Sequence, residues 1–145
     1  MKFQVRIPFV EALGFELLRF DNGESEIAMT PRDEHLNSWS VVHGGVLMTL
    51  LDVAMAHAAR APVKGSPGDP RGVVTVEMKT AFMRPGTGAL RARGRVLHRT
   101  SSLAFCEGSI VGADDTLLAH ATGTFKYLRA LPAGGRQLKT LNASD

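Results

Sequence analysis

The spacing of hydrophobic residues along the chain predicts one long helix between two groups of strands. From about Gly44 to Arg60, alanine, leucine and methionine fall nearly all round a helical wheel, which is typical of a buried helix. These residues are good helix formers, and Pro62 ends the helix shortly after Arg60. One acidic residue, Asp52, interrupts this apolar run and needs an explanation.

The remaining segments mostly alternate between hydrophobic and polar residues, as β-strands do. Two strands are expected before the helix and four after it, and the short turns between the last four favour an antiparallel meander. A turn at Asp21-Asn22-Gly23 joins the first two strands. The first expected strand begins at about Phe15, and the others cover 24–30, 73–83, 89–98, 103–111 and 116–128.

A single apolar helix needs an apolar surface to cover it, and one curved antiparallel sheet supplies that surface. We therefore predict an α+β fold in which the sheet wraps around the central helix. The length of 145 residues suits a single domain, which we place at residues 1–130. Residues 131–145 are expected to form a flexible C-terminal tail.

Composition and charge narrow the possible functions. The net charge of +3 suits an anionic ligand but is too weak to indicate nucleic acid as a partner. The single cysteine, Cys106, leaves no internal disulfide, and no spacing of His, Cys and Asp predicts a metal site. No signal peptide or membrane span is recognisable. We therefore expect a cytoplasmic protein that uses no metal, cofactor or membrane partner.

Asp52 lies where a charge is costly to bury. A carboxylate in such a run is paired, borders a wet cavity, or has a function. The spacing alone leaves two interpretations equally open. Asp52 is either a functional group or a structural aspartate that bonds to neighbouring backbone or to an arginine.

The residues at the start of the helix favour a function. The run His43-Gly44-Gly45 stands where free backbone N–H groups and the positive end of the helix dipole attract negative charge. Glycine lets a ligand oxygen approach the backbone closely, and an oxyanion hole for acyl transfer requires such a donor. The alternative is that the glycines only permit a tight turn into the helix.

The distance between these two features constrains the assembly. Gly44 and Asp52 are eight residues apart in sequence, which places them roughly 12 Å apart along a helix axis. Both groups cannot contact one carbonyl within one chain. If they serve one reaction, the helices of two subunits run antiparallel past each other, and a two-fold dimer carries two shared sites.

The motif itself resembles a known family. Residues 35–56, HLNSWSVVHGGVLMTLLDVAMA, resemble the N-x(5)-HGG-x(6)-D pattern of PaaI-like acyl-CoA thioesterases, which have the hotdog fold. Residues 72–85 resemble the strand that follows the helix in that group, and the order of elements matches from about Phe15 to Leu128. The resemblance implies hydrolysis of a small, medium-chain or aryl acyl-CoA without a cofactor. It also implies a homotetramer built from two homodimers.

The resemblance also assigns roles to individual residues. Asp52 is implied to be the catalytic carboxylate, acting as general base on water or as nucleophile. The Gly44 N–H is implied to polarise the thioester carbonyl, while Asn37 and His43 orient the water or the carbonyl. Thr75 stands where the family often has Ser or Thr, near Asp52 of the same subunit.

Three further residues are candidates for substrate binding. Gly45 belongs to the glycine pair at the helix start, where a ligand oxygen can approach. Trp39 either lines the acyl pocket or anchors the loop before the helix. Arg99 lies at a strand end beside hydroxyls and backbone amides, which suits a coenzyme A phosphate. Ser40 stands where many relatives have glycine, which bears on how Asn37 is placed.

Other polar and reactive side chains are given structural interpretations. Arg91, Arg93 and Arg95 alternate along one strand and are expected on a solvated outer face, although a basic surface for coenzyme A phosphates is the alternative. The histidines His57, His98 and His120 are expected to be packed or surface residues, and Cys106 is expected to pack in the core.

Two other functions compete with the thioesterase. A hotdog protein that binds acyl-CoA as a sensor or carrier has little use for a carboxylate beside a thioester. A hotdog dehydratase or hydratase requires a His-plus-acid arrangement that the sequence does not display. The thioesterase interpretation rests on Asp52, the HGG turn and Asn37 together.

Overall fold

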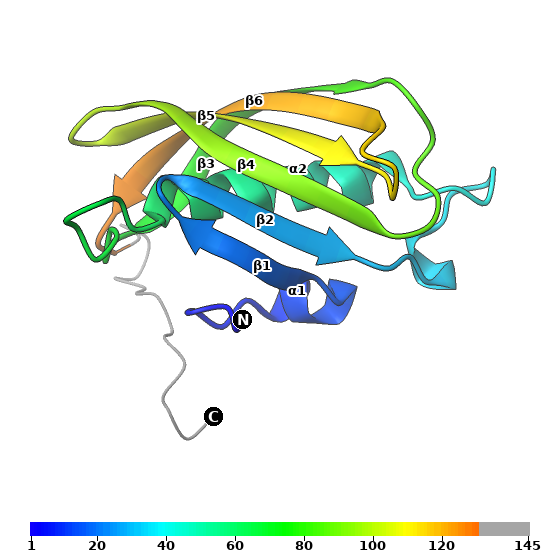
Figure 1. The fold of residues 1–145 in the computed structure, drawn as a ribbon, viewed down its shortest axis with the longest axis horizontal. Coiled ribbons are helices and arrows are strands. Elements are labelled where there is room, and N and C mark those ends of the chain that lie inside the picture. Colours follow the sequence, from blue (N-terminus) through cyan, green and yellow to red (C-terminus); the bar gives the residue numbers. More distant parts are fainter. Residues whose placement is uncertain (131–145) are drawn as a thin grey trace.

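The computed structural model describes residues 1–130 and consists of one curved antiparallel sheet that wraps around one long helix (Figure 1). The α+β architecture predicted from the sequence is confirmed. The predicted tail, residues 131–145, lies outside the described residues. The elements are α1 (Pro8–Leu13), β1 (Glu16–Asp21), β2 (Glu24–Met29), the short 3₁₀ helix η1 (Asp33–His35), α2 (Gly44–Arg60), β3 (Gly72–Phe82), β4 (Leu90–Arg99), β5 (Leu103–Val111) and β6 (Leu117–Leu128).

The predicted element boundaries agree with the structure to within one or two residues. The helix begins at Gly44 and ends at Arg60, as predicted. The glycine pair marks its start, and Pro62 prevents it from continuing. The predicted turn between β1 and β2 is present, with positive φ at Asn22 (51°) and Gly23 (70°). Two successive positive φ values are what a two-residue hairpin turn of the primed type needs, and Asn-Gly supplies them.

The strand order corrects the predicted meander. The order in the sheet is β1-β2-β4-β5-β6-β3, so β4, β5 and β6 form a meander but β3 pairs with β6 at the sheet edge. The chain passes from β3 to β4 through residues 83–89, around the N-terminal end of α2, where the Val42 N–H donates to the Gly86 carbonyl. A short connection was therefore misread as a hairpin, because the sheet curves far enough around α2 for a loop to join distant strands.

A row of small residues crosses the sheet beneath α2. Ser25, Gly94, Gly108 and Ala121 are paired in register across β2, β4, β5 and β6. At Gly94 the helix backbone approaches so closely that a Cβ atom would lie 2.5 Å from the Ala54 carbonyl oxygen. The small size of the residues along this row lets the helix backbone lie against the sheet.

A hydrogen bond fixes the helix at the same point. The Ser25 hydroxyl is buried and donates to the Ala54 carbonyl oxygen at 2.6 Å. On either side of this contact, the helix packs large side chains, among them Leu51 and Met55, into the hydrophobic core. The sheet thereby sets the position of α2 both along and across the strands.

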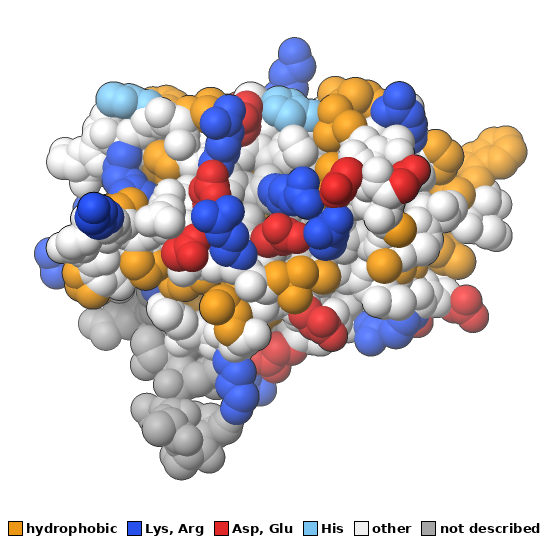
Figure 2. Space-filling view, in the orientation of Figure 1, with side chains coloured by type: hydrophobic (Ala, Val, Ile, Leu, Met, Phe, Trp, Pro, Cys, Tyr) orange, Lys and Arg blue, Asp and Glu red, His pale blue; other side chains and the backbone are white. Residues whose placement is uncertain are grey.

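The outer face of the sheet carries paired charges. Figure 2 shows Lys or Arg side chains interspersed with Asp or Glu side chains on this face. Arg91 and Arg93 each pair with Glu26 and Asp115, and Arg95 pairs with Glu107. The prediction of a solvated outer face for the three arginines is confirmed, and the predicted burial of Cys106 in the core is confirmed as well.

The close approach at Gly94 predicts unequal costs for two glycine substitutions. Gly94→Ala is expected to lower the free energy of unfolding by about 3 kcal/mol or more, because backbone atoms of α2 must move. Gly108→Ala meets the Leu51 and Met55 side chains at 3.2 Å and the Arg93 carbonyl oxygen only at an ordinary 3.5 Å, so its cost is expected to stay below about 1.5 kcal/mol. Urea unfolding of both variants measures the difference. Equal losses would contradict the role given to Gly94.

Candidate active site

Asp52 lies on the stripe of α2 that the sheet leaves partly uncovered. The side chain is half-buried, and its Oδ1 accepts a hydrogen bond from the Thr75 hydroxyl at 2.5 Å. Thr75 lies in β3, just before an irregularity in the pairing with β6 at Val76. The structure therefore places Thr75 beside Asp52 in the same chain, where the sequence predicts it.

The surroundings of Asp52 alter its ionisation. Partial burial among apolar side chains raises the pKa of the Asp52 carboxyl above its ordinary value. The hydrogen bond from Thr75 stabilises the carboxylate and offsets part of this increase in pKa. A carboxylate with few hydrogen-bond donors and a raised pKa is a better Brønsted base than an ordinary aspartate.

The start of α2 holds one backbone donor that the fold leaves free. His43 caps the helix, and its Nδ1 accepts a hydrogen bond from the Gly45 N–H at 2.8 Å. Within the described residues the Gly44 N–H has no acceptor. Of the two glycines predicted to receive a ligand oxygen, Gly44 therefore offers its N–H, while the N–H of Gly45 is used by the cap.

Asn37 organises the loop before the helix. Its Oδ1 accepts hydrogen bonds from the Trp39 N–H at 2.8 Å and from the Val41 N–H at 3.3 Å. Ser40 has a φ of 57°, in the left-handed region that glycine adopts most easily. The loop therefore accommodates serine, and Trp39 projects into solvent with 84% of its surface exposed. In a single chain, the Trp39 side chain therefore neither lines an acyl pocket nor anchors the loop, which were the two predicted alternatives.

The predicted residues form two groups within one chain. Asn37, His43 and Gly44 gather at the start of α2, whereas Asp52 and Thr75 lie about two turns further along. Because α2 is continuous from Gly44 to Arg60, the helix rise keeps the two groups roughly 12 Å apart.

A groove opens at the first of these groups. It has a volume of about 320 Å³ and lies between the loop before α2 and the segment after β3. Two larger hollows, of about 360 Å³ beside the N-terminal segment and about 610 Å³ on the outer sheet face, contain none of the predicted site residues. The groove is lined by Asn37, Val41, Val42, Gly44, Leu47, Phe82, Met83, Arg84, Pro85 and Gly86.

Sequence reasoning missed the aromatic side chain at the end of β3. Phe82 is half-exposed, and its ring lies 3.5 Å from where a Cβ atom of Gly44 would be. A large apolar pair, Phe82 and Met83, at the exposed end of a strand just before Pro85 was the available signal. The pairing of β3 with β6, which brings this pair to the helix start, was not predictable from the sequence spacing.

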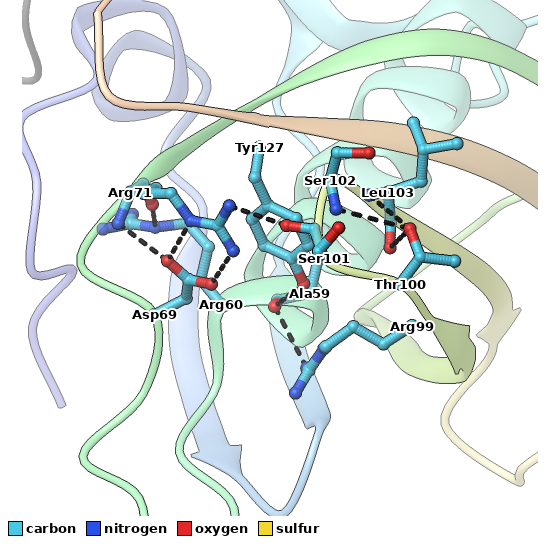
Figure 3. Close-up of polar contacts among 10 residues, drawn as sticks. All are labelled: Ala59, Arg60, Asp69, Arg71, Arg99, Thr100, Ser101, Ser102, Leu103 and Tyr127. Atoms are coloured by element: carbon cyan, nitrogen blue, oxygen red, sulfur yellow. Dashed lines mark hydrogen bonds and ion pairs between the residues drawn. The ribbon is translucent and has the colours of Figure 1, made fainter.

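Arg99 lies at the opposite end of α2, in a cluster with two other arginines (Figure 3). Its Nη2 donates to the Ala59 carbonyl oxygen at 3.1 Å, and its buried Nε has no partner. Arg71 forms a two-point ion pair with Asp69. Arg60 donates from Nε to the Arg71 carbonyl oxygen. Arg99, the residue predicted to bind a coenzyme A phosphate, is therefore held at the C-terminal end of the helix.

The described residues contain no group of three side chains suited to hold a metal ion. Across residues 1–130, none of the helices has the length and hydropathy needed to cross a membrane.

Comparison with known proteins identifies the family. The family model described as Thioesterase superfamily matches residues 40–119, which include the helix, Asp52 and Thr75. The chain belongs to the thioesterase superfamily. The predicted hotdog fold and thioester hydrolase activity are thereby confirmed.

Individual relatives place the chain near the PaaI-like members of the superfamily. The PaaI protein from the phenylacetic acid degradation operon of Escherichia coli is 27% identical, with a TM-score of 0.74 over 89% of this chain and 86% of that chain. The protein PA5202 from Pseudomonas aeruginosa is 30% identical, with a TM-score of 0.79 over 86% and 97%. By sequence, the medium/long-chain acyl-CoA thioesterase YigI of Salmonella typhimurium is 26% identical over 85% of this chain and 87% of YigI.

The contact between Thr75 and Asp52 predicts a measurable change in pKa. Thr75→Val removes the hydrogen bond to the carboxylate while keeping the shape of the side chain, so the pKa of Asp52 is expected to rise further. Thr75→Ser keeps the hydroxyl and is expected to leave that pKa near its wild-type value. A ¹³C NMR titration of the aspartate carboxyl carbons measures both variants, and an unchanged pKa in Thr75→Val would refute the effect.

A second titration prediction concerns His57, which the structure confirms as a packed residue. His57 is 5% exposed, and the Phe3 and Phe20 rings lie edge-on to it. Its Nδ1 donates to the Val53 carbonyl oxygen, while Nε2 is buried without a partner. Burial lowers the pKa of His57 from 6.5 to about 4.

The unfolded chain therefore binds a proton between pH 6.5 and about 4 that the folded chain does not bind. Stability is expected to fall as the pH falls through this window, by about 3 kcal/mol in total. His57→Gln does not titrate and is expected to lose less stability between pH 7 and pH 4.5 than the wild type. Urea unfolding at the two pH values measures this difference, and equal pH dependence in both proteins would contradict it.

Proposed function

We propose that this protein is an acyl-CoA thioesterase whose reaction uses Asp52 as base or nucleophile and the Gly44 N–H as oxyanion donor. The observation that carries the proposal is the combination of a base with a raised pKa and a free backbone donor at a helix N-terminus. Acyl-CoA is chosen because one relative bears the name of a medium/long-chain acyl-CoA thioesterase.

The proposed chemistry needs no further cofactor. The Gly44 N–H receives the carbonyl oxygen, and the helix dipole stabilises the negative charge that develops on it. Asp52 either removes a proton from the attacking water or attacks the carbonyl carbon itself. Asn37 and His43 orient the water or the carbonyl from the loop and the cap.

The site is proposed to form between two copies of this chain. Asp52 lies on a stripe of α2 with Gly45, Thr49 and Ala56, where no described residue fully covers the helix. This stripe is made of small or half-exposed residues, so a second helix can pack closely against it. The distance of roughly 12 Å between Gly44 and Asp52 requires the donor to come from the partner.

The edge strand β3 offers a way to join the two copies. It has eleven residues, lies at the end of the strand order, and pairs on one side only. A long unpaired edge is a template for another strand. Thr75 stands before the middle of β3 and Phe82 at its end. Antiparallel pairing about Met78 and Lys79 brings the Phe82 end of one copy near Thr75 of the other, and therefore Gly44 near Asp52.

Arg99 remains a proposed ligand for a coenzyme A phosphate. Support comes from the surplus of positive charge in its cluster. Asp69 is the only carboxylate that ion-pairs with the three arginines among the described residues, and its oxygens are engaged by Arg71. An anionic group that reaches the C-terminal end of α2 would meet the guanidinium groups of Arg60 and Arg99.

Two variants with a matched control test the catalytic roles. Asp52→Asn is expected to lower kcat by about 10²- to 10⁴-fold. Gly44→Pro replaces the N–H with a ring carbon, at a helix position that tolerates proline, and is expected to lower kcat by about 10²- to 10³-fold. Gly44→Ala keeps the N–H and meets Phe82 at an ordinary distance, so its activity is expected to stay near wild type. Thiol release from octanoyl-CoA measures all three.

Mixing the two inactive variants tests the shared site. A heterodimer of Asp52→Asn with Gly44→Pro holds one site with both native groups and one site with neither. Refolding the two chains together at equal amounts is expected to restore about a quarter of wild-type activity. No restoration would contradict a site shared between subunits. Acyl-CoA binding without turnover by the wild type would favour the sensor or carrier function instead.

A further inference from the structure

Trp39 is the only tryptophan in the chain, and 84% of its surface is exposed. The turn that carries it is closed by two backbone hydrogen bonds, from the Asn37 N–H to the Val41 carbonyl at 2.8 Å and from the Ser40 N–H to the Asn37 carbonyl at 3.0 Å. Ser40 has a positive φ, which costs energy in a residue other than glycine. The turn therefore holds the indole outward at a fixed place. Fixed aromatic side chains are the anchors that protein interfaces favour.

The turn reaches past the start of α2. Figure 1 shows the loop before the helix extending beyond the N-terminal end of α2. Leu36 and Val42 pair in an isolated antiparallel bridge, so the chain leaves the body and returns as two short arms with Trp39 between them. The three residues from Val42 to Trp39 span roughly 10 Å at most, so the indole is carried up to about that distance from its own helix.

The proposed pairing of two copies determines which surface lies there. With Gly44 of one copy beside Asp52 of the partner subunit, the antiparallel partner helix continues past the start of α2 toward its own C-terminal end. At 1.5 Å per residue, Ala56 and Arg60 of the partner subunit lie roughly 6 and 12 Å beyond the partner's Asp52, within the reach of Trp39. Trp39 cannot reach Ala56 of its own chain, which lies roughly 18 Å past Gly44 on the same helix.

Ala56 and Arg60 form a surface that suits an indole. Ala56 is half-buried and small, which leaves room for a flat ring. The Arg60 Nε donates to the Arg71 carbonyl at 2.9 Å, and within residues 1–130 the two Arg60 Nη groups have no acceptor. Arg71 stacks on the Tyr127 ring at 4.3 Å, whereas Arg60 makes no such contact in the described part of the chain. Tryptophan is the best aromatic partner for a guanidinium, and stacking leaves the N–H groups at its edge free for an anion.

We infer that Trp39 packs against Ala56 and Arg60 of the partner subunit. The indole thereby covers the side of the partner's Asp52 that faces the C-terminal end of α2. The inference rests on the antiparallel dimer of the proposed function. In a single chain the Asp52 carboxylate is only half-buried, and the indole keeps water from one side of it. Trp39 is a positioning residue, because it changes the surroundings of Asp52 and touches no reacting atom.

Crosslinking tests the contact. In the full chain with Trp39→Cys and Ala56→Cys, a short bismaleimide is expected to join the two cysteines between subunits and give a dimer on denaturing gels. Cys106 does not compete, because it is 1% exposed and burial raises the pKa of its thiol to about 12. Trp39→Cys with Phe9→Cys is the control, since Phe9 is 61% exposed and precedes β1, at the sheet edge opposite to β3. Crosslinking in both variants, or in neither, would overturn the inference.

The fluorescence of Trp39 reports its burial in the wild type. Acrylamide is expected to quench its emission several-fold less than that of free N-acetyltryptophanamide. Equal quenching would overturn the inference. Protection that appears only with coenzyme A or with phosphatidylglycerol vesicles would also overturn it, and would assign the indole to a ligand or to a membrane.

The pH profile of hydrolysis tests the covering role. Trp39→Ala admits water to Asp52, so the pKa of Asp52 is expected to fall toward its ordinary value. The acid limb of kcat/KM for octanoyl-CoA then moves to lower pH, and Trp39→Phe, which keeps an apolar ring, restores most of the wild-type profile. The other groups that face Asp52 stay in place, namely Thr75 of its own chain and, in the proposed dimer, the partner's His43 and Gly44. An unshifted limb in Trp39→Ala would refute the covering role.

The first two experiments need no turnover, so they separate this inference from the proposed function. Crosslinking and protection in a protein that hydrolyses no acyl-CoA would support the contact and refute the thioesterase. Hydrolysis by a protein that shows neither would overturn this inference alone.

Discussion

The close contact between the α2 backbone and the sheet at Gly94 determines the geometry of the rest of the molecule. Ser25 and Gly94 hold the helix at Ala54, two residues beyond Asp52, with a hydrogen bond and with the absence of a side chain. A helix held at that point presents Asp52 toward β3, where Thr75 can donate to it. A larger residue in the row would lift the helix and separate these two side chains.

The sequence predicted the local features of the fold well, because local residues specify them. The glycine pair and Pro62 delimit α2, and Asn22-Gly23 specifies a hairpin turn through its positive φ values. The position of β3 was not predictable in the same way. Residues 83–89 are compatible with a hairpin, and only the curvature of the whole sheet brings β3 beside β6.

The candidate site shows the same division between local and long-range information. The HGG run and Asp52 drew attention through their placement on one helix, and Thr75 through the family pattern. Phe82 carried no motif, and its contact with the helix start depends on the partner that β3 chooses. Arg99 was correctly placed at a strand end, but its bond to the Ala59 carbonyl belongs to the packing of the helix terminus.

The helix cap has a consequence for proton transfer. Because His43 Nδ1 accepts the Gly45 N–H, a neutral imidazole in this position must hold its hydrogen on Nε2. The capped ring thereby has one neutral tautomer, in which the Nδ1 lone pair is engaged by the Gly45 N–H. It can only offer its Nε2 hydrogen outward. In the proposed reaction the His43 ring would therefore donate a hydrogen bond, and the Asp52 carboxylate would accept the proton.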